Sequence, residues 1–284
     1  MHRVIHFIFA FVLAGRLAGQ DVAAPEPQWQ PRFTGVDVAE LSTGSPRMLR
    51  AVVVRIDLQA PGLSFTATPS NGPKPGETDA AYTTSFLVKN GLQAAINAAP
   101  FDKVYEKEGG PQDVRGLLVT GGEVVSKPGS LPALVISREN RARIASAPVD
   151  TKDAWTAVGG FSVVLRGGEL THTGDKKLHP RTAAGVSKDG RWLWWLVVDG
   201  RQLLWSGGVT TEEVGTWMKK LGAWDAINLD GGGTSIAVVA GSDGKPQVLN
   251  RPVHGGVPGR ERVAGCHLGL KALPLQVKKA EPAE

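Results

Sequence analysis

The chain has 284 residues, a formal net charge of +5 and a single cysteine. Its length is ample for one large domain with its own hydrophobic core. The basic residues are scattered, whereas nucleic-acid binding needs a concentrated basic face, so the composition excludes that class of function. Cys266 stands alone, so no disulfide can form within the chain, and its apolar neighbours indicate a small buried side chain.

The N-terminus has the order of a secretory signal peptide. A short basic start is followed by an apolar run at residues 4–13 and by small residues near Ala18. This order predicts a signal peptide over residues 1–19, and therefore a secreted, periplasmic or cell-envelope protein. A segment that tethers the chain to a membrane is the alternative, although the apolar run is too short for a stable membrane span.

Composition divides the remaining chain into three parts. Residues 20–31 are rich in proline, alanine and glutamine and are predicted to form a linker. Residues 278–284 form a charged tail, and both of these segments are expected to be mobile. Between them, residues 32–277 are expected to fold as one domain.

Short strands separated by glycine turns dominate this domain. The first clear strand is the β-branched, alternating segment at residues 49–58. Hairpins are predicted where two apolar runs flank a pair of glycines or an Asp-Gly pair. The predicted turns are Gly121-Gly122, Gly167-Gly168 and Asp189-Gly190.

Two helices are predicted, at residues 84–90 and 211–221, and a glycine follows each of them. Thr210 and Glu213 form a capping-box pair at the start of the second helix, and its apolar residues follow helical spacing. Together these elements predict an α+β fold, with a strand-rich mixed sheet and a few packed helices in a single domain.

Three apolar segments end in a polar residue that precedes a turn. These residues are Asn97, Asp199 and Asp230, and the last is followed directly by Gly231-Gly232-Gly233. Side chains at strand ends, held by a rigid sheet, are common places for a binding site. If the three ends converge, one amide and two carboxylates share a pocket. Asp199-Gly200 taken alone is equally well explained as an ordinary hairpin turn.

Two carboxylates in one cleft are the usual equipment for breaking a glycosidic bond. One donates a proton to the leaving oxygen, and the other supports the oxocarbenium-like transition state. A phosphate ester leaves well without such a proton, so neutralising its charge matters more. Arg181 and Arg262 are the candidate phosphate ligands, because a guanidinium matches two phosphate oxygens. As alternatives, Arg181 is a surface ion-pair residue and Arg262 pairs with the adjacent Glu261.

The triple glycine does not match the loops that bind nucleotide phosphates. Neither the G-x-x-x-x-G-K-S/T pattern nor G-x-G-x-x-G opening a helix occurs, and a strand is expected after Gly233. The histidines show no metal-ligand spacing, so neither a metal site nor a cofactor is predicted.

Taken in this order, the segments resemble the phosphodiester glycosidase family over about residues 52–270. The matching pieces lie at residues 95–97 with Phe101, and at 158–168, 180–185, 197–201, 221–235, 250–252 and 261–263. The chain departs from the family pattern at Ala98-Ala99-Pro100, where the family has glycine directly after its asparagine. It also has Thr234 where serine is usual, and the hydroxyl is kept.

The resemblance implies a secreted hydrolase that cleaves the glycosidic C–O bond of a sugar-1-phosphodiester in envelope or extracellular glycans. We expect Asp230 and Asp199 to be the working carboxylates, with acid and base unassigned between them and Glu261 as a third candidate. The expected substrate-binding residues are Asn97 and Ser235 for sugar hydroxyls, Arg181 and Arg262 for phosphate, the backbone N–H groups of Gly231, Gly232 and Gly233 as an anion nest, and Thr234.

Two other functions remain open at this stage. One is a non-catalytic module that binds glycan or teichoic acid on the same scaffold. The other is a metal-assisted phosphodiesterase that cuts a P–O bond with a metal on Asp199 and Asp230. The expected partner is a phosphorylated glycan or a sugar-1-phosphodiester, and neither nucleic acid nor a membrane span is expected. The sequence leaves the oligomeric state open.

Overall fold

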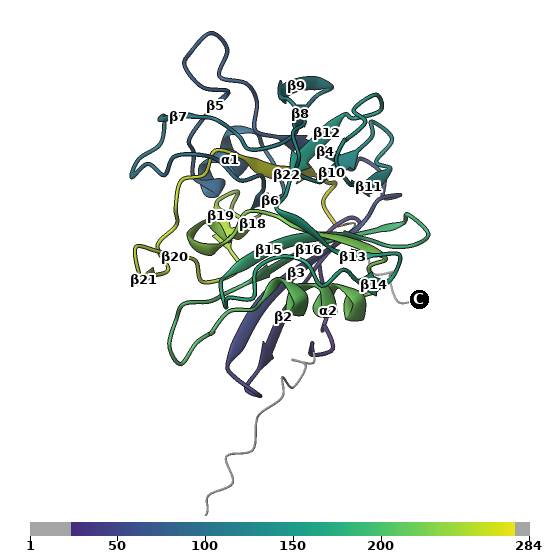
Figure 1. Ribbon diagram of the computed structural model, residues 1–284, viewed down its shortest axis with the longest axis vertical. Coiled ribbons are helices and arrows are strands. Elements are labelled where there is room, and N and C mark those ends of the chain that lie inside the picture. The colour runs from purple at the N-terminus through teal and green to yellow at the C-terminus, as the bar shows by residue number, and fades with distance from the viewer. Residues whose placement is uncertain (1–23, 276–284) are drawn as a thin grey trace, which may run out of the picture.

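Residues 24–275, the part of the chain that the computed structural model describes, form mainly β-strands with two α-helices (Figure 1). The predicted signal peptide at residues 1–19 and the predicted tail at 278–284 lie outside the described residues. The first strand already includes Gln30 and Pro31, which are the last two residues of the predicted linker.

The largest sheet has eight strands in the order β1-β2-β3-β16-β15-β17-β13-β14. These strands are β1 (Gln30–Phe33), β2 (Val36–Thr43), β3 (Leu49–Asp57), β16 (Trp192–Val198), β15 (Arg181–Val186), β17 (Asp225–Asn228), β13 (Ser162–Arg166) and β14 (Glu169–Leu170). The hairpins predicted at Gly167-Gly168 and Asp189-Gly190 are confirmed, since they join β13 to β14 and β15 to β16.

Two five-stranded sheets cover one face of the large sheet, in the orders β11-β10-β12-β8-β9 and β19-β18-β6-β22-β4. The strands of the first are β8 (Leu118–Thr120), β9 (Glu123–Ser126), β10 (Ala133–Ile136), β11 (Ala142–Ala145) and β12 (Thr156–Gly159). Those of the second are β4 (Ser64–Ala67), β6 (Ala94–Asn97), β18 (Ala237–Ala240), β19 (Pro246–Val248) and β22 (His267–Lys271). Two short pairs complete the set: β5 (Thr78–Asp79) with β7 (Pro111–Gln112), and β20 (Val253–His254) with β21 (Val257–Pro258).

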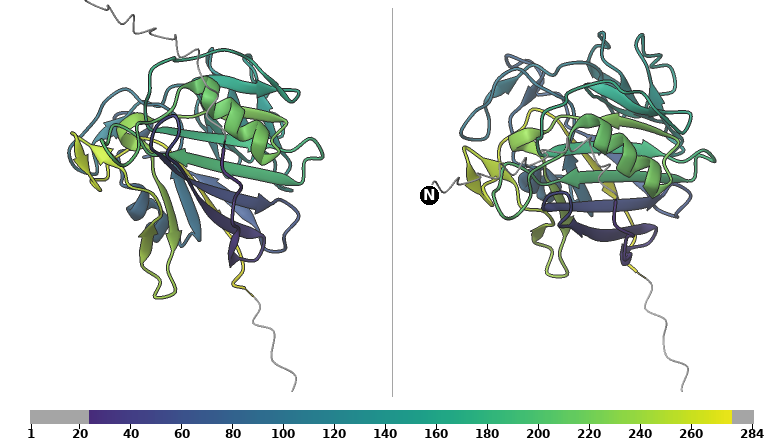
Figure 2. Two further views of the ribbon diagram at one scale, coloured as in Figure 1. Left: turned by 90° about the horizontal axis from the view of Figure 1, so that it is seen from below. Right: turned by 60° about the horizontal axis from the view of Figure 1, so that its bottom comes forward.

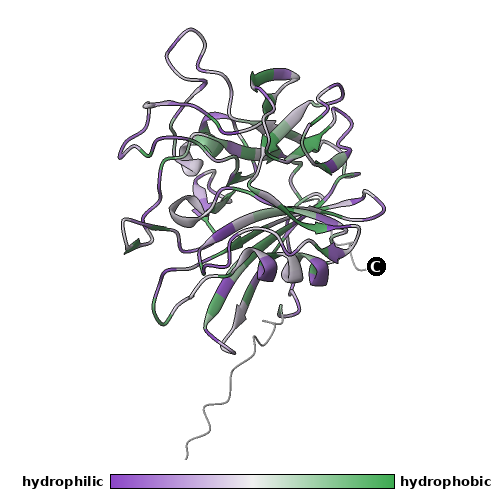
Figure 3. Cartoon of the chain, in the orientation of Figure 1, coloured by the Kyte–Doolittle hydropathy of each residue, from purple (hydrophilic) through white to green (hydrophobic). Residues whose placement is uncertain are grey.

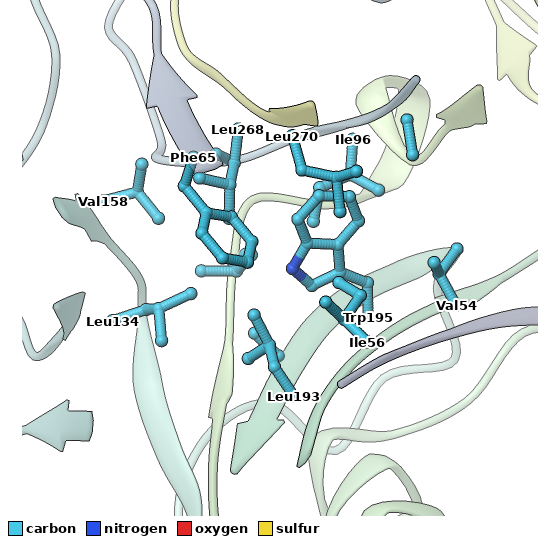
Figure 4. Packing of buried hydrophobic residues seen from close by; sticks show 14 of the residues in the cluster. Val54, Ile56, Phe65, Ile96, Leu134, Val158, Leu193, Trp195, Leu268 and Leu270 are labelled. Atoms are coloured by element: carbon cyan, nitrogen blue, oxygen red, sulfur yellow. The ribbon is translucent and has the colours of Figure 1, made fainter. Parts of the chain in front are cut away.

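The main core lies between the large sheet and the two smaller ones. Figure 4 shows Trp195 of the large sheet beside Phe65 of β4, and their ring centroids lie 6.3 Å apart in an edge-to-face arrangement. Leu268 and Val158, from the two smaller sheets, close the same cluster. Figure 3 shows this layer as hydrophobic ribbon, with hydrophilic residues mainly in the surrounding loops.

The other face of the large sheet is covered by α2 (Thr211–Leu221), which lies across the strands in Figure 2. Trp217 and Met218 of this helix are buried in a second core, which includes Trp194 and Leu196 of β16. Because β16 is buried on both faces, its sequence is a continuous apolar run. The predicted capping box of α2 is confirmed, and Gly222 ends the helix with a φ of 101°.

The shorter helix, α1 (Thr83–Lys89), begins one residue before its predicted start and packs on β6 and β18. The fold is therefore strand-rich with two helices in the described chain, in line with that part of the prediction. The predicted mixed sheet is wrong, because several sheets are present and the described strand pairs are antiparallel. Within residues 24–275, no helix has both the length and the apolar character needed to cross a membrane.

Candidate functional site

Two of the three polar strand ends meet at one edge of the large sheet. β16 and β17 flank β15 and run in the same direction, so Asp199 and Asp230 follow them at the same edge. Pro180 lies between the two turns: its carbonyl accepts from Gly232 N–H at 2.8 Å, and a Cβ on Gly200 would lie 2.6 Å from its nitrogen. The turns after both aspartates are therefore packed on the same short segment.

The third strand end, Asn97 of β6, is hydrogen-bonded to the Asp230 turn through its fully buried side chain. Its Nδ2 donates to the main-chain carbonyl of Asp230 at 2.7 Å. Its Oδ1 accepts from the Thr182 hydroxyl at 2.7 Å and from Ile236 N–H at 3.1 Å. With no exposed surface, Asn97 holds the Asp230 turn in place and does not reach a sugar, contrary to the predicted role.

Asp230 itself is half-buried. Its Oδ2 accepts from the Thr234 hydroxyl at 2.7 Å, which orients the group. Desolvation raises the pKa of Asp230 to about 6, even though the Thr234 hydroxyl and the nearby Arg262 charge favour the ionised form. A carboxyl group with that pKa exchanges protons readily near neutral pH, as acid–base chemistry requires.

Two arginine side chains pack so closely on Gly232 and Gly233 that larger residues do not fit after Asp230 without a shift. Gly232 has a φ of 68°, and a Cβ there would lie 3.0 Å from an Arg201 guanidinium nitrogen. A Cβ on Gly233 would overlap the Arg262 guanidinium. These residues begin the short 3-10 helix η1 (Gly232–Thr234), so the strand expected directly after Gly233 starts only at Ala237. The glycines let two cations rest on the backbone beside Asp230.

Each arginine is held by a histidine and not by a carboxylate. Arg262 Nε donates to His254 Nδ1 at 3.0 Å, and His254 Nε2 lies 3.6 Å from a carboxylate oxygen of Glu106. Arg201 approaches His179 Nδ1 at 3.2 Å in the same way.

The series of contacts that begins at Arg201 also ends at a carboxylate, because His179 Nε2 lies 3.6 Å from a carboxylate oxygen of Asp175. Burial and the neighbouring guanidinium charges lower the pKa of both histidines, which keeps them neutral acceptors. In the described chain neither Arg201 nor Arg262 has an ion-pair partner, so both charges are available to an anion beside the glycine turn.

The predicted nest of glycine N–H groups is largely used within the protein. Gly232 N–H donates to Pro180, and Gly231 N–H favours the ionised Asp230 carboxylate. The Ser235 side chain is enclosed, and its hydroxyl has no hydrogen-bond partner among the described residues. Positive charge at this turn therefore comes from side chains and not from the backbone.

Asp199 differs from Asp230 because its carboxylate is saturated by protein donors. It accepts from Trp205 Nε1 at 2.8 Å, from Asn250 Nδ2 at 2.9 Å and from Arg251 N–H at 3.1 Å. It lines a cavity of about 400 Å³ whose lining does not include Asp230. The two carboxylates therefore do not share this cavity, contrary to the prediction. Asp199 instead connects the end of β16 to residues 250 and 251.

Two further candidates have structural partners. Glu261 accepts from Thr84 N–H at 3.1 Å and from the Thr84 hydroxyl at 2.8 Å, so it caps the N-terminus of α1. Arg181 points to the α2 side of the sheet, where it bonds Asp175 at 3.1 Å and the Val209 carbonyl at 3.2 Å. Neither predicted role, catalysis for Glu261 or phosphate binding for Arg181, fits this geometry.

Sequence reasoning missed Arg201, His179 and His254. Arg201 directly follows Asp199-Gly200, so its place in that motif was an available signal. The two histidines share no spacing pattern, because His254 lies 8 residues from its arginine and His179 lies 22 residues from its own. Ala98 and Ala99, which depart from the family pattern, are buried in the main core.

Comparisons with known proteins point to one family. A family model described as phosphodiester glycosidase matches residues 90–270. The catalytic domain of zebrafish N-acetylglucosamine-1-phosphodiester α-N-acetylglucosaminidase, auto-inhibited by its pro-peptide, is 18% identical with a TM-score of 0.60, over 87% of each chain. A hypothetical protein from Synechocystis is 14% identical with a TM-score of 0.64, over 85% of this chain and 64% of that one.

At these identities the two structures show a shared fold. The chain spans less than two thirds of the Synechocystis protein's length. No curated protein matches the chain significantly.

Proposed function

The chain belongs to the phosphodiester glycosidase family, and from this premise we propose that it hydrolyses the glycosidic C–O bond of a sugar-1-phosphodiester. The products are a free sugar and a phosphomonoester. We further propose that the protein is secreted or resides in the cell envelope, where its substrate is a phosphorylated glycan.

One observation carries the proposal: a carboxyl group with a pKa of about 6 lies beside two guanidinium groups that have no ion-pair partner in the described chain. A sugar-1-phosphodiester presents an anomeric carbon next to an anionic phosphate. Arg201 and Arg262, resting on Gly232 and Gly233, match the phosphate, and Asp230 matches the carbon beside it.

In the proposed mechanism the arginines bind the phosphate and stabilise the charge that it gains as the C–O bond breaks. Because phosphate leaves as an anion, no proton donor is required at the leaving oxygen. Ionised Asp230 then supports the oxocarbenium-like carbon, as nucleophile or as the base that activates water. Thr234 orients the carboxylate, and His179 and His254 hold the arginines.

Hydrolysis in heavy-oxygen water tests the bond that is cleaved. If the C–O bond breaks, the phosphomonoester product carries no heavy oxygen, because water attacks the sugar. The measurement uses mass spectrometry of the phosphomonoester, since the anomeric oxygen of a free sugar exchanges with water. Label in the phosphate would establish P–O cleavage and a phosphodiesterase. Retention of the glycan without release of any product would establish a binding module.

The pH dependence of kcat/KM reports the ionisation of free Asp230. A phosphodiester keeps one charge between pH 4 and 8, so the substrate does not titrate there. Since the ionised carboxylate is the working form, kcat/KM is expected to rise with pH and to level off above about 6. A rate that is constant between about pH 5 and 7 would contradict this assignment.

Thr234→Val is the matched variant for the pH profile. It removes the hydroxyl that donates to Asp230 and keeps the shape of the side chain. Since that hydrogen bond favours the ionised carboxylate, its loss raises the pKa of Asp230 and moves the inflection to higher pH. An unmoved inflection would assign the titration to another group.

A further inference from the structure

The loop at residues 201–205, between β16 and α2, presents two leucines to solvent. Leu203 is 94% exposed and Leu204 is 85% exposed. Over residues 24–275, the next most exposed large hydrophobic residue is Val88 at 54%. Two adjacent leucines held this far out of the protein form an apolar tip that the fold itself does not cover.

This loop is fixed to the protein on both sides of the tip. Gln202 and Ser206 form an isolated β-bridge, and Gln202 Nε2 donates to the Arg251 carbonyl at 2.7 Å. The Ser206 hydroxyl donates to the Asp199 carbonyl at 2.6 Å. Trp205 is anchored as well, through its hydrogen bond to the Asp199 carboxylate. The exposure of the leucines is therefore built into the loop and does not come from a loose segment.

Backbone strain also concentrates at this loop. Leu204 has a φ of 60° and Arg201 a φ of 57°, and they are two of the four non-glycine residues with positive φ in the described chain. A bulky side chain rarely adopts this conformation. Such strain persists where the surrounding structure imposes it, and it clusters at functional segments.

Two cations lie over Trp205, the residue that follows the leucines. The guanidinium groups of Arg50 and Arg251 lie over the Trp205 ring, 4.2 and 5.0 Å from its centroid. Neither they nor Arg201 form an ion pair within the part of the chain that is described. Of the two carboxylates that line the adjacent cavity, Asp199 is buried and Glu40 is exposed. The three guanidinium groups near Trp205 and at the start of the loop thus outnumber these two carboxylates by one.

We infer that the loop at residues 201–205 is an interfacial anchor that inserts Leu203 and Leu204 into an anionic lipid bilayer. An apolar tip enters the acyl region of a bilayer, while arginines around it bind the anionic headgroups. A contact with another protein needs no unpaired cations next to the apolar residues. The charge around the tip therefore favours a lipid surface over a second copy of this chain.

The anchor lies next to the proposed site, because Arg201 begins this loop and also rests on Gly232. A bilayer that binds the leucines then lies close to Asp230. This geometry favours sugar phosphodiesters whose second ester group is a membrane lipid. That choice of substrate rests on the proposed function, whereas the binding of the loop to lipid does not.

An environment-sensitive dye at the tip tests insertion directly. The dye is attached to a Leu203→Cys variant of the full chain, and Cys266 stays unlabelled because it is buried and burial raises its pKa to about 12. We expect the emission to shift to the blue on vesicles of equal parts phosphatidylglycerol and phosphatidylcholine, and far less on phosphatidylcholine alone. A Val124→Cys variant, labelled on the exposed strand β9, is expected to show no shift.

Three outcomes of the dye experiment would overturn the inference. In the first, the emission of the dye on the Leu203→Cys variant does not shift on either kind of vesicle. In the second, the emission shifts equally at both labelled positions. The third is a shift that appears without vesicles and grows with protein concentration, which would indicate a second copy of the chain. Because the dye reports the loop itself, membrane binding by the N-terminal segment does not affect the result.

Activity measurements test the substrate class. The double variant Leu203→Ser/Leu204→Ser is expected to lose at least about tenfold in turnover of a lipid-ester sugar phosphodiester in anionic vesicles. Turnover of a soluble sugar phosphodiester is expected to stay at the wild-type rate. The control Val124→Ser/Val248→Ser removes two exposed apolar side chains elsewhere and is expected to match wild type on both substrates.

An equal effect of the loop variant on both substrates would overturn the preference for lipid-borne substrate. If wild type turns over neither substrate, the proposed function fails, and the dye experiment still decides whether the loop binds lipid.

Discussion

The Asp230→Asn variant is expected to lose about three orders of magnitude in kcat while keeping the wild-type fold. The amide keeps the shape of the side chain and still accepts from the Thr234 hydroxyl, but it cannot carry the negative charge that the reaction uses. The measurement is turnover of a soluble sugar-1-phosphodiester at pH 8, with unfolding in urea followed on the same preparation.

Stability should change in the opposite direction to activity. The pKa of Asp230 is raised in the folded protein to about 6, so the ionised carboxylate opposes folding above that pH. Replacing it by a neutral amide removes this penalty. The free energy of unfolding at pH 8 is therefore expected to stay equal to that of wild type or to exceed it.

The same substitution at Asp199 is the matched control. Its two carboxylate oxygens accept hydrogen bonds from three residues, and the amide nitrogen of asparagine cannot accept those made to the oxygen that it replaces. Asp199→Asn is thus expected to unfold at lower urea, while its folded fraction keeps turnover within about tenfold of wild type. Loss of turnover in folded Asp199→Asn, with activity retained in Asp230→Asn, would exchange the roles given to the two carboxylates.

Elements with local signals could be predicted from sequence. The capping box and the final glycine of α2 lie within the helix and its flanks, and the Asp189-Gly190 turn lies between the two strands that it joins. The order of strands in the sheets has no such local signal. β17 pairs with β13 and β15, and β6 lies between β18 and β22, because distant apolar faces pack together.

At the site, sequence could identify which residues are polar at strand ends but not what they contact. Asp230 and its glycines stand out because few structures need three consecutive glycines. Asn97 and Glu261 are also polar residues that the sequence offers as candidates. In the fold, however, their side chains form hydrogen bonds with backbone groups of the protein. Arg181 and Arg201 differ in the same way, since only the fold determines which guanidinium has a carboxylate partner.

The Asn97→Ala variant is expected to lower the free energy of unfolding by about 3 to 5 kcal/mol. Truncation leaves the Asp230 carbonyl, the Thr182 hydroxyl and Ile236 N–H without their partner, and the side chain has no exposed surface through which water could replace it. Each unpartnered buried group costs about 1 to 3 kcal/mol, so the loss exceeds that from a missing side chain alone. Urea unfolding with an unchanged m-value measures it.

Ile96→Val, one residue earlier in β6, separates this network from ordinary packing. Ile96 is also fully buried, and removing one methyl group there is expected to cost about 1 kcal/mol. If Asn97→Ala were no more destabilising than Ile96→Val, the three groups would have found other partners. The folded fraction of Asn97→Ala is expected to turn over substrate more slowly than Ile96→Val, because the Asp230 main chain has lost its anchor to β6. The residue predicted to bind a sugar thus acts on the reaction through the position of Asp230.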